Sequence, residues 1–154
     1  WVRLRDGRRG RVVRQTPESV ELCPPGGGLI TYRTLDFLAE NPQNLSKGFR
    51  IDIVFRIDHC HREAATTKIP QKMREYLVRR IPMFVPEEML VDVRVELREA
   101  GPSSLDYEIE IDLGGGAAPH YEQVERGAIG ILLDAANENG WKIPFHQIAL
   151  HQAP

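Results

Sequence analysis

The most constraining feature of this sequence is the alternating stretch Leu105–Leu113, which reads Leu-Asp-Tyr-Glu-Ile-Glu-Ile-Asp-Leu. Because side chains alternate across a β-strand, its apolar residues face one side of a sheet and its carboxylates face the other. Such a strand buries only one face, so it needs antiparallel neighbours and a helical cover over the apolar side. The acidic side, Asp106, Glu108, Glu110 and Asp112, favours basic or solvated surroundings, since like charges on adjacent strands repel.

Length and composition indicate a soluble globular chain of one domain or two small ones. The 154 residues are enough to bury a core without disulfides or metal. The two cysteines, Cys23 and Cys60, lie far apart in the sequence and indicate a reducing compartment more than a disulfide framework. No apolar run approaches the ~20 residues that cross a bilayer, and we expect no secretory leader at the Trp-Val-Arg-Leu-Arg start.

Charge is distributed unevenly along the chain. Residues 1–14 carry six arginines and one acid, a net charge of +5, whereas the remainder carries 14 basic and 21 acidic residues, a net charge of -7. The basic start predicts a negative partner, either a membrane surface or a nucleic acid. The arginines concerned are Arg3, Arg5, Arg8, Arg9, Arg11 and Arg14.

Residues 1–47 are expected to form a small, Sm-like β barrel, because short strands at close spacing are separated by turn signals. Asp6-Gly7 is a strong turn pair, and the Pro24–Gly28 run must be a turn or loop. The expected strands are Val2–Leu4, Arg11–Thr16, the run around Val20 and Leu22, and Leu29–Tyr32, with a helical turn at Leu35–Glu40.

Residues 48–154 are expected to form a ferredoxin-like βαββαβ domain, so the fold class of the whole chain is α+β. In that topology the first and third strands are usually central, and the two best alternating patterns, Ile51–Ile57 and Leu105–Leu113, occupy those places. The remaining expected elements are a strand at Val91–Leu97, a helix from about His120 to Asn139 stopped by Gly140, and a final strand at about Phe145–Leu150.

The helix between the first two of these strands places Ile69, Met73 and Leu77 on one stripe. With Thr66 or Thr67 as its N-cap, Pro70 lies in the first turn, where its missing N–H costs nothing. If the helix starts near Arg62 instead, Pro70 must kink it.

Three short motifs invite functional readings that their local chemistry does not favour. In Asp58–His61 an extended backbone places His59 and His61 on one face but turns Cys60 away, which favours a polar strand-to-helix loop over a zinc site. Gly114–Gly116 lacks the Gly-Lys-Ser/Thr ending of a phosphate loop, which favours a hinge or solvated loop. The pair Gly127 and Gly130 favours a helix packed tightly on its own sheet over a contact with a neighbour. We therefore expect no catalytic, cofactor-binding or metal-binding residues.

The two halves together resemble the cytoplasmic part of the small-conductance mechanosensitive channel (MscS) family. The segments that carry this resemblance are Trp1–Leu4, Asp6-Gly7, Gly10–Val13, Gly27–Thr31 and Asn44–Ser46 in the first half, and Ser104–Leu113, Tyr121–Gly140 and Ile143–Phe145 with Gln147 in the second. Their order and spacing over nearly the whole chain make the resemblance fairly specific. Tyr32-Arg33-Thr34 departs from the usual Ile-Pro-Asn of the family.

The resemblance implies a homo-oligomer, heptameric in that family, on the cytoplasmic face of the inner membrane. It implies β domains in a ring below the membrane and α/β domains in a hollow cage, through whose openings ions and small osmolytes pass. The chain starts where the membrane helices of the family end, so the resemblance implies a soluble piece without pore residues. It also implies no enzymatic role, and the arginine-rich start would lie beside an anionic leaflet.

Two other functions stay open on the sequence alone. An RNA-binding module would combine a basic β barrel with a ferredoxin-like sheet, but its open face should display stacking aromatics, and here it displays acids that repel phosphate. A regulatory small-ligand domain is the second alternative, although nothing in the sequence identifies a ligand. An enzyme is the least favoured class, because no nucleophile–base pair or paired-carboxylate constellation stands out.

Overall fold

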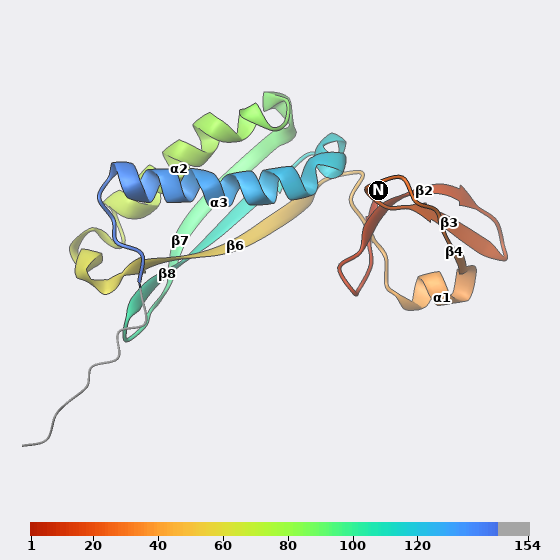
Figure 1. Cartoon of the computed structure of the whole chain (residues 1–154), viewed down its shortest axis with the longest axis horizontal. Coiled ribbons are helices and arrows are strands. Elements are labelled where there is room, and N and C mark those ends of the chain that lie inside the picture. The colour runs from red at the N-terminus through yellow and green to blue at the C-terminus, as the bar shows by residue number, and fades with distance from the viewer. Residues whose placement is uncertain (145–154) are drawn as a thin grey trace, which may run out of the picture.

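The computed structural model describes residues 1–144 and shows two sheets arranged end to end along one axis (Figure 1). The expected α+β fold is confirmed, with two antiparallel sheets and helices on one face of the second. The expected boundary between residues 47 and 48 falls between the last strand of the first sheet and the first strand of the second. The division of the chain into two domains at this point stays a prediction. None of the described helices is long and apolar enough to cross a membrane.

The first sheet contains five short strands in the order β4-β3-β2-β1-β5. Its elements are β1 (Val2–Arg3), β2 (Arg9–Gln15), β3 (Ser19–Cys23), β4 (Ile30–Arg33), α1 (Thr34–Ala39) and β5 (Gln43–Asn44). A small core of Leu4, Val20, Leu22 and Phe37 holds this unit together. Gly7 adopts a φ of +86°, as the expected Asp6-Gly7 turn requires. Strands β1 to β4 match those expected to within two residues at their ends, whereas β5 was not expected. Closure of this sheet into a barrel stays a prediction.

The second sheet contains three long antiparallel strands in the order β6-β8-β7. These are β6 (Phe49–Asp58), β7 (Leu90–Ala100) and β8 (Ser104–Leu113). The central position of β8 and its place beside β6 are those of the third and first strands of a ferredoxin-like unit. The final strand expected at about Phe145–Leu150 lies outside the described residues. The chain does return toward β6, since the Asp58 N–H donates to the Lys142 carbonyl at 2.8 Å.

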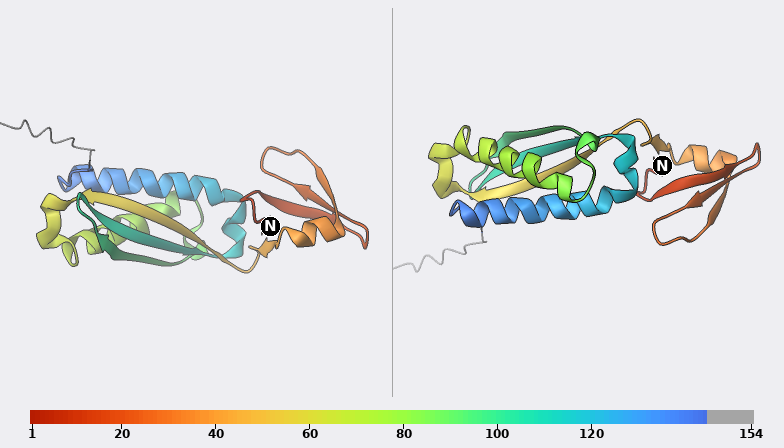
Figure 2. Two further views of the ribbon diagram at one scale, coloured as in Figure 1. Left: turned by 90° about the horizontal axis from the view of Figure 1, so that it is seen from below. Right: turned by 90° about the horizontal axis from the view of Figure 1, so that it is seen from above.

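Two helices, α2 (Lys68–Arg80) and α3 (Tyr121–Glu138), cover one face of this sheet, as the two views of Figure 2 show from opposite sides. Helix α2 begins after Thr67, so Pro70 lies in its first turn, and the start near Arg62 is wrong. Thr67 occupies the N-cap position, but its side chain makes no capping hydrogen bond. Short 3-10 turns connect the elements, at His59–Ala64 (η1), Ile81–Met83 (η2), Glu87–Met89 (η3) and Gly115–His120 (η4).

The alternation of apolar and acidic side chains along β8 determines which of its residues enter the main hydrophobic core. Its five apolar side chains, Leu105, Tyr107, Ile109, Ile111 and Leu113, are each at most 1% exposed, and they pack beneath the two helices. The hydroxyl of Tyr107 donates to the Ala65 carbonyl at 2.8 Å, which satisfies a polar group that would otherwise be buried alone. Burial raises the pKa of Tyr107 to about 12.

Candidate functional site

The open face of the second sheet, on the side away from α2 and α3, collects most of the charged side chains that the sequence places on its strands. The register of the three strands brings acids of β8 opposite residues of both neighbours, for example Asp112 opposite Arg50 and Asp92, and Glu110 opposite Arg94. On this face lie the carboxylates of Asp52, Asp92, Glu96, Glu99, Asp106, Glu108, Glu110 and Asp112, and the guanidiniums of Arg50, Arg56 and Arg94. Carboxylates outnumber guanidiniums, so the face is acidic.

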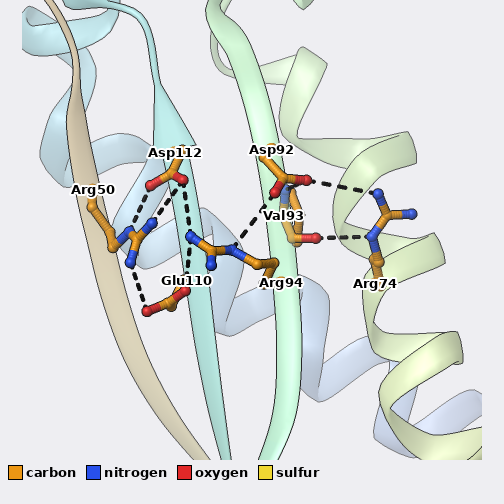
Figure 3. Close-up of polar contacts among 7 residues, drawn as sticks. All are labelled: Arg50, Arg74, Asp92, Val93, Arg94, Glu110 and Asp112. Carbon is orange, nitrogen blue, oxygen red and sulfur yellow. Dashed lines mark hydrogen bonds and ion pairs between the residues drawn. The ribbon is translucent and has the colours of Figure 1, made fainter.

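One end of the face is a closed network of ion pairs (Figure 3). Arg50 holds Asp112 with two hydrogen bonds, of 2.6 Å and 2.9 Å, and reaches Glu110 at 2.7 Å. Arg94 approaches the same two acids from the other side, at 3.1 Å from Glu110 and 3.4 Å from Asp112. The hydrogen bonds from Arg50, with the charge of Arg94, lower the pKa of Asp112 and keep it ionised.

The network continues around the outer edge of β7 to helix α2. Arg74 donates from Nε to the Val93 carbonyl at 2.8 Å, and its Nη2 lies 3.8 Å from Asp92 Oδ1 (Figure 3). Strand β7 is the edge of the described sheet, so Arg74 occupies a carbonyl that would otherwise be free to pair with another strand. This contact also ties the helical layer to the charged face.

A separate pair lies near the other end of the face. Arg56 donates to Asp106 at 3.1 Å, and the Ser104 hydroxyl donates to the same carboxylate at 2.7 Å. The hydrogen bond from Ser104, with that from Arg56, lowers the pKa of Asp106. Between the two paired regions lie Glu96 and Glu108, which are exposed cross-strand neighbours with no ion pair among the described residues. Negative charge that no described ion pair balances therefore lies at the centre of this face.

The acids of β8 thus face solvent, as their spacing predicts. Glu110 and Asp112 have basic partners on both flanking strands, and Asp106 has one on β6. The alternation within β8 does not by itself identify those partners. The signal was present, because Arg50 and Arg56 on β6, and Arg94 on β7, occupy the same period-two positions as the acids. Only the register shows that these arginines lie opposite Asp112, Asp106 and Glu110.

The arginines of the N-terminal segment do not act as one unit. Arg8 is paired with Asp6, and Arg14 lies 3.9 Å from Glu21. Arg9 lies over the ring of Tyr121, with its guanidinium carbon 3.9 Å from the ring centroid, and its Nη2 lies 2.9 Å from Glu122. The remaining three, Arg3, Arg5 and Arg11, form no ion pair with the described residues.

The Asp58–His61 motif has a structural role in the described part of the chain. The Asp58 carboxylate accepts the Cys60 N–H at 2.8 Å and caps η1, and the His61 Nε2 accepts the Lys142 N–H at 3.0 Å. A side-chain hydrogen bond with the same Asp58 carboxylate raises the pKa of the Cys60 thiol. Within residues 1–144, no three His, Cys, Asp or Glu side chains are grouped as a metal site requires.

The glycine motifs are packed more tightly than expected. Gly114–Gly116 is not an open hinge or solvated loop, because a Cβ at Gly115 would lie 1.8 Å from the Ser46 carbonyl oxygen. In α3, Gly127 packs against the ring of Phe84 in its own chain, whereas Gly130 has open space around it. Gly127 thus permits close packing within the protomer, although against the segment after α2 and not against the sheet.

The two sheets, their order in the chain and the helical cover of the second define the fold of the MscS-type mechanosensitive channels. Helicobacter pylori MscS in its closed state matches with a TM-score of 0.63 and 16% sequence identity, over 99% of this chain and 58% of that chain. MSL1 of Arabidopsis thaliana matches with a TM-score of 0.57 and 11% identity, over 88% of this chain and 48% of that chain. This chain therefore spans about half the length of these channels. Neither a protein-family model nor a curated protein sequence matches it.

Proposed function

We propose that this chain forms the cytoplasmic vestibule of an MscS-type mechanosensitive channel, which releases ions and small osmolytes when membrane tension rises. The observation that supports this function most strongly is the likeness to Helicobacter pylori MscS over 99% of the chain, because it includes both sheets in the same chain order. The matched structures are channels and not enzymes, which agrees with a role without catalysis.

In this proposal the chain assembles with copies of itself, as a heptamer. Residues 1–47 form a ring below the membrane, and residues 48–154 form the wall of a cage. The N-terminal arginines lie toward the cytoplasmic leaflet of the inner membrane, where a basic side chain is worth about 1 kcal/mol if it lies within a Debye length of anionic lipid. Arg5 and Arg11 suit this role because both are exposed and neither is paired with a described acid.

The acidic face of the second sheet lines a water-filled passage of the cage in this proposal. Its centre at Glu96 and Glu108 attracts cations, while the Arg50–Asp112 and Arg56–Asp106 pairs hold the strands in register without adding net charge. A face of this kind raises the local concentration of permeating cations and does not bind them at a fixed site.

The composition of this face disfavours RNA as a partner. The aromatic residues of β6 and β8, Phe49, Phe55 and Tyr107, are all buried beneath the helices, so they offer no stacking platform. The exposed positions are mainly carboxylates, which repel a phosphate backbone.

Two measurements test the proposed function. The coding sequence upstream of Trp1 is expected to contain one or more apolar segments of ~20 residues, each long enough to span a bilayer. The full-length protein, expressed in cells that lack their own tension-gated channels, is expected to produce tension-activated currents in excised patches and to improve survival of hypo-osmotic shock. A full-length protein without membrane segments, or one that stays electrically silent up to lytic tension, contradicts the proposal.

A further inference from the structure

A cleft of about 530 Å³ lies where the first sheet meets the beginning of α3. The N-terminus lies close to this junction, between the two bodies of the molecule (Figure 1). Its lining comes from β1, the β1–β2 turn, β2, the segment after α1, β5 and the start of α3, and it includes Arg3, Arg5, Arg9, Asn41, Gln43 and Tyr121. A volume of this size accommodates a small polar molecule with its hydration water.

The cleft is electropositive. Three of its lining residues, Arg3, Arg5 and Arg9, carry guanidiniums, and Glu125 is the one carboxylate in the lining. Arg5 is exposed and has no ion pair among the described residues. Arg3 uses one donor, with its Nη1 at 3.4 Å from the Tyr121 hydroxyl. Since a guanidinium has five N–H donors, most of the donors of Arg3 and Arg5 are not used within the protein.

Arg9 is held in place at the cleft, with its charge balanced by Glu122. Its guanidinium is fixed between the Tyr121 ring and the Glu122 carboxylate, and its side chain is only 16% exposed. The side-chain amides of Asn41 and Gln43 add neutral donors to the same cleft. The free donors of Arg3 and Arg5 suit an oxyanion, because the planar fork of arginine matches carboxylate and phosphate oxygens.

We propose that this cleft binds a small oxyanion, a phosphate or a carboxylate, through Arg3 and Arg5, with Arg9 held in place beside them by Tyr121 and Glu122. The ligand would contact β1 and β2 on one side and α3 on the other, so its binding stabilises the junction between the two sheets. The site belongs to the chain itself and does not depend on the proposed channel function.

The test is a titration of the purified chain with inorganic phosphate at constant ionic strength, followed by the NMR signals of the arginine Nε–Hε groups. The signals of Arg3 and Arg5 are expected to move together and saturate with a dissociation constant on the order of 1 mM. Arg5→Gln is expected to weaken binding about tenfold, the loss of one charge-assisted hydrogen bond. Arg11→Gln, which removes the same charge from the same segment outside the cleft, is expected to leave the constant unchanged.

A second arm distinguishes free phosphate from a lipid headgroup. Vesicles of phosphatidylcholine with and without phosphatidylglycerol are mixed with the wild-type chain and with the Arg3→Gln, Arg5→Gln and Arg11→Gln variants. Saturable phosphate binding supports the site with a soluble ligand, and binding to the anionic vesicles alone that is lost in Arg3→Gln or Arg5→Gln supports it with a headgroup. Absence of both, or an equal loss in Arg11→Gln, overturns the proposal and leaves the channel proposal untouched.

Discussion

The guanidinium of Arg9 lies over the ring of Tyr121, with its central carbon 3.9 Å from the ring centroid. Arg9 belongs to β2 of the first sheet and Tyr121 begins α3 of the second unit, so this cation–π contact joins the two halves of the chain. Phe49 stacks on the same ring, with centroids 5.2 Å apart, and connects it to the start of β6. Tyr121 is 6% exposed, so the contact is largely removed from water.

Arg9→Gln is expected to lower the free energy of unfolding by about 1–2 kcal/mol, because a partly buried cation–π contact and the ion pair with Glu122 are both lost. Chemical denaturation followed by circular dichroism measures the change. Arg11→Gln is the matched control on the same strand, and it is expected to change stability by less than about 0.5 kcal/mol. An equal effect of the two substitutions would show that Arg9 acts only through net charge.

Gly115→Ala is expected to destabilise the chain by about 3 kcal/mol or more, because the new methyl group would lie 1.8 Å from the backbone oxygen of Ser46 and neither backbone segment is free to move. Gly130→Ala is the control, since nothing lies within 4 Å of the new methyl group. In the interior of α3 the alanine is expected to stabilise by about 0.5–1 kcal/mol. Thermal unfolding of both variants measures these opposite changes in stability.

Acid unfolding should depend on Asp112. Its pKa is lowered in the folded chain, so the stability that it contributes is present above the unfolded value of about 3.9 and is lost as the pH falls through the folded pKa. Asp112→Asn is expected to be less stable at pH 7 and to lose less stability between about pH 5 and pH 2. Glu108→Gln, which removes a carboxylate of the same strand, is the control. If it reduces the loss of stability at low pH as much as Asp112→Asn does, the effect comes from net charge and not from the Asp112 ion pairs.

Tyr107 is expected to determine part of the alkaline stability. Burial raises its pKa to about 12, so the folded chain retains a proton that the unfolded chain loses near pH 10, and stability falls as the pH rises through that interval. Tyr107→Phe is expected to lose about 1–2 kcal/mol at pH 7, because the Ala65 carbonyl loses its partner, and to show a weaker decline above pH 10. Denaturation at several pH values measures both effects, and an unchanged alkaline decline would contradict the assignment.

In a full-length channel, Glu96→Gln with Glu108→Gln is expected to reduce the preference for cations. Each charge at a solvated surface contributes less than about 1 kcal/mol, so the loss of both should lower the ratio of cation to anion permeability by less than about thirtyfold. Reversal potentials in asymmetric KCl measure this ratio. Glu88→Gln, an exposed carboxylate in η3 and not on the sheet face, is the control. An unchanged permeability ratio in the double variant would show that this face does not line the path of the permeating ions.

Several features of the site could not be predicted from the local sequence pattern alone. The alternation in Leu105–Leu113 correctly predicts which side chains of β8 are buried and which are exposed, because the period of a strand depends only on its backbone geometry. It does not predict that Arg50 and Arg94 close on Asp112, because that depends on the register of strands far apart in the sequence. The tight approach of Gly115 to Ser46 is likewise a contact between distant segments, and the sequence shows only a run of glycines.

The sequence alone determined the element types, the α+β class and the burial of alternating side chains, because helix stripes, strand periods and turn residues are local properties. It also carried enough of the motif order to suggest the MscS-type fold. The tertiary structure alone decided which charges pair across the sheet, that Arg9 meets Tyr121, and that Arg3 and Arg5 border a cleft. Those outcomes depend on how segments separated by up to 118 positions, as Arg3 and Tyr121 are, come to lie together.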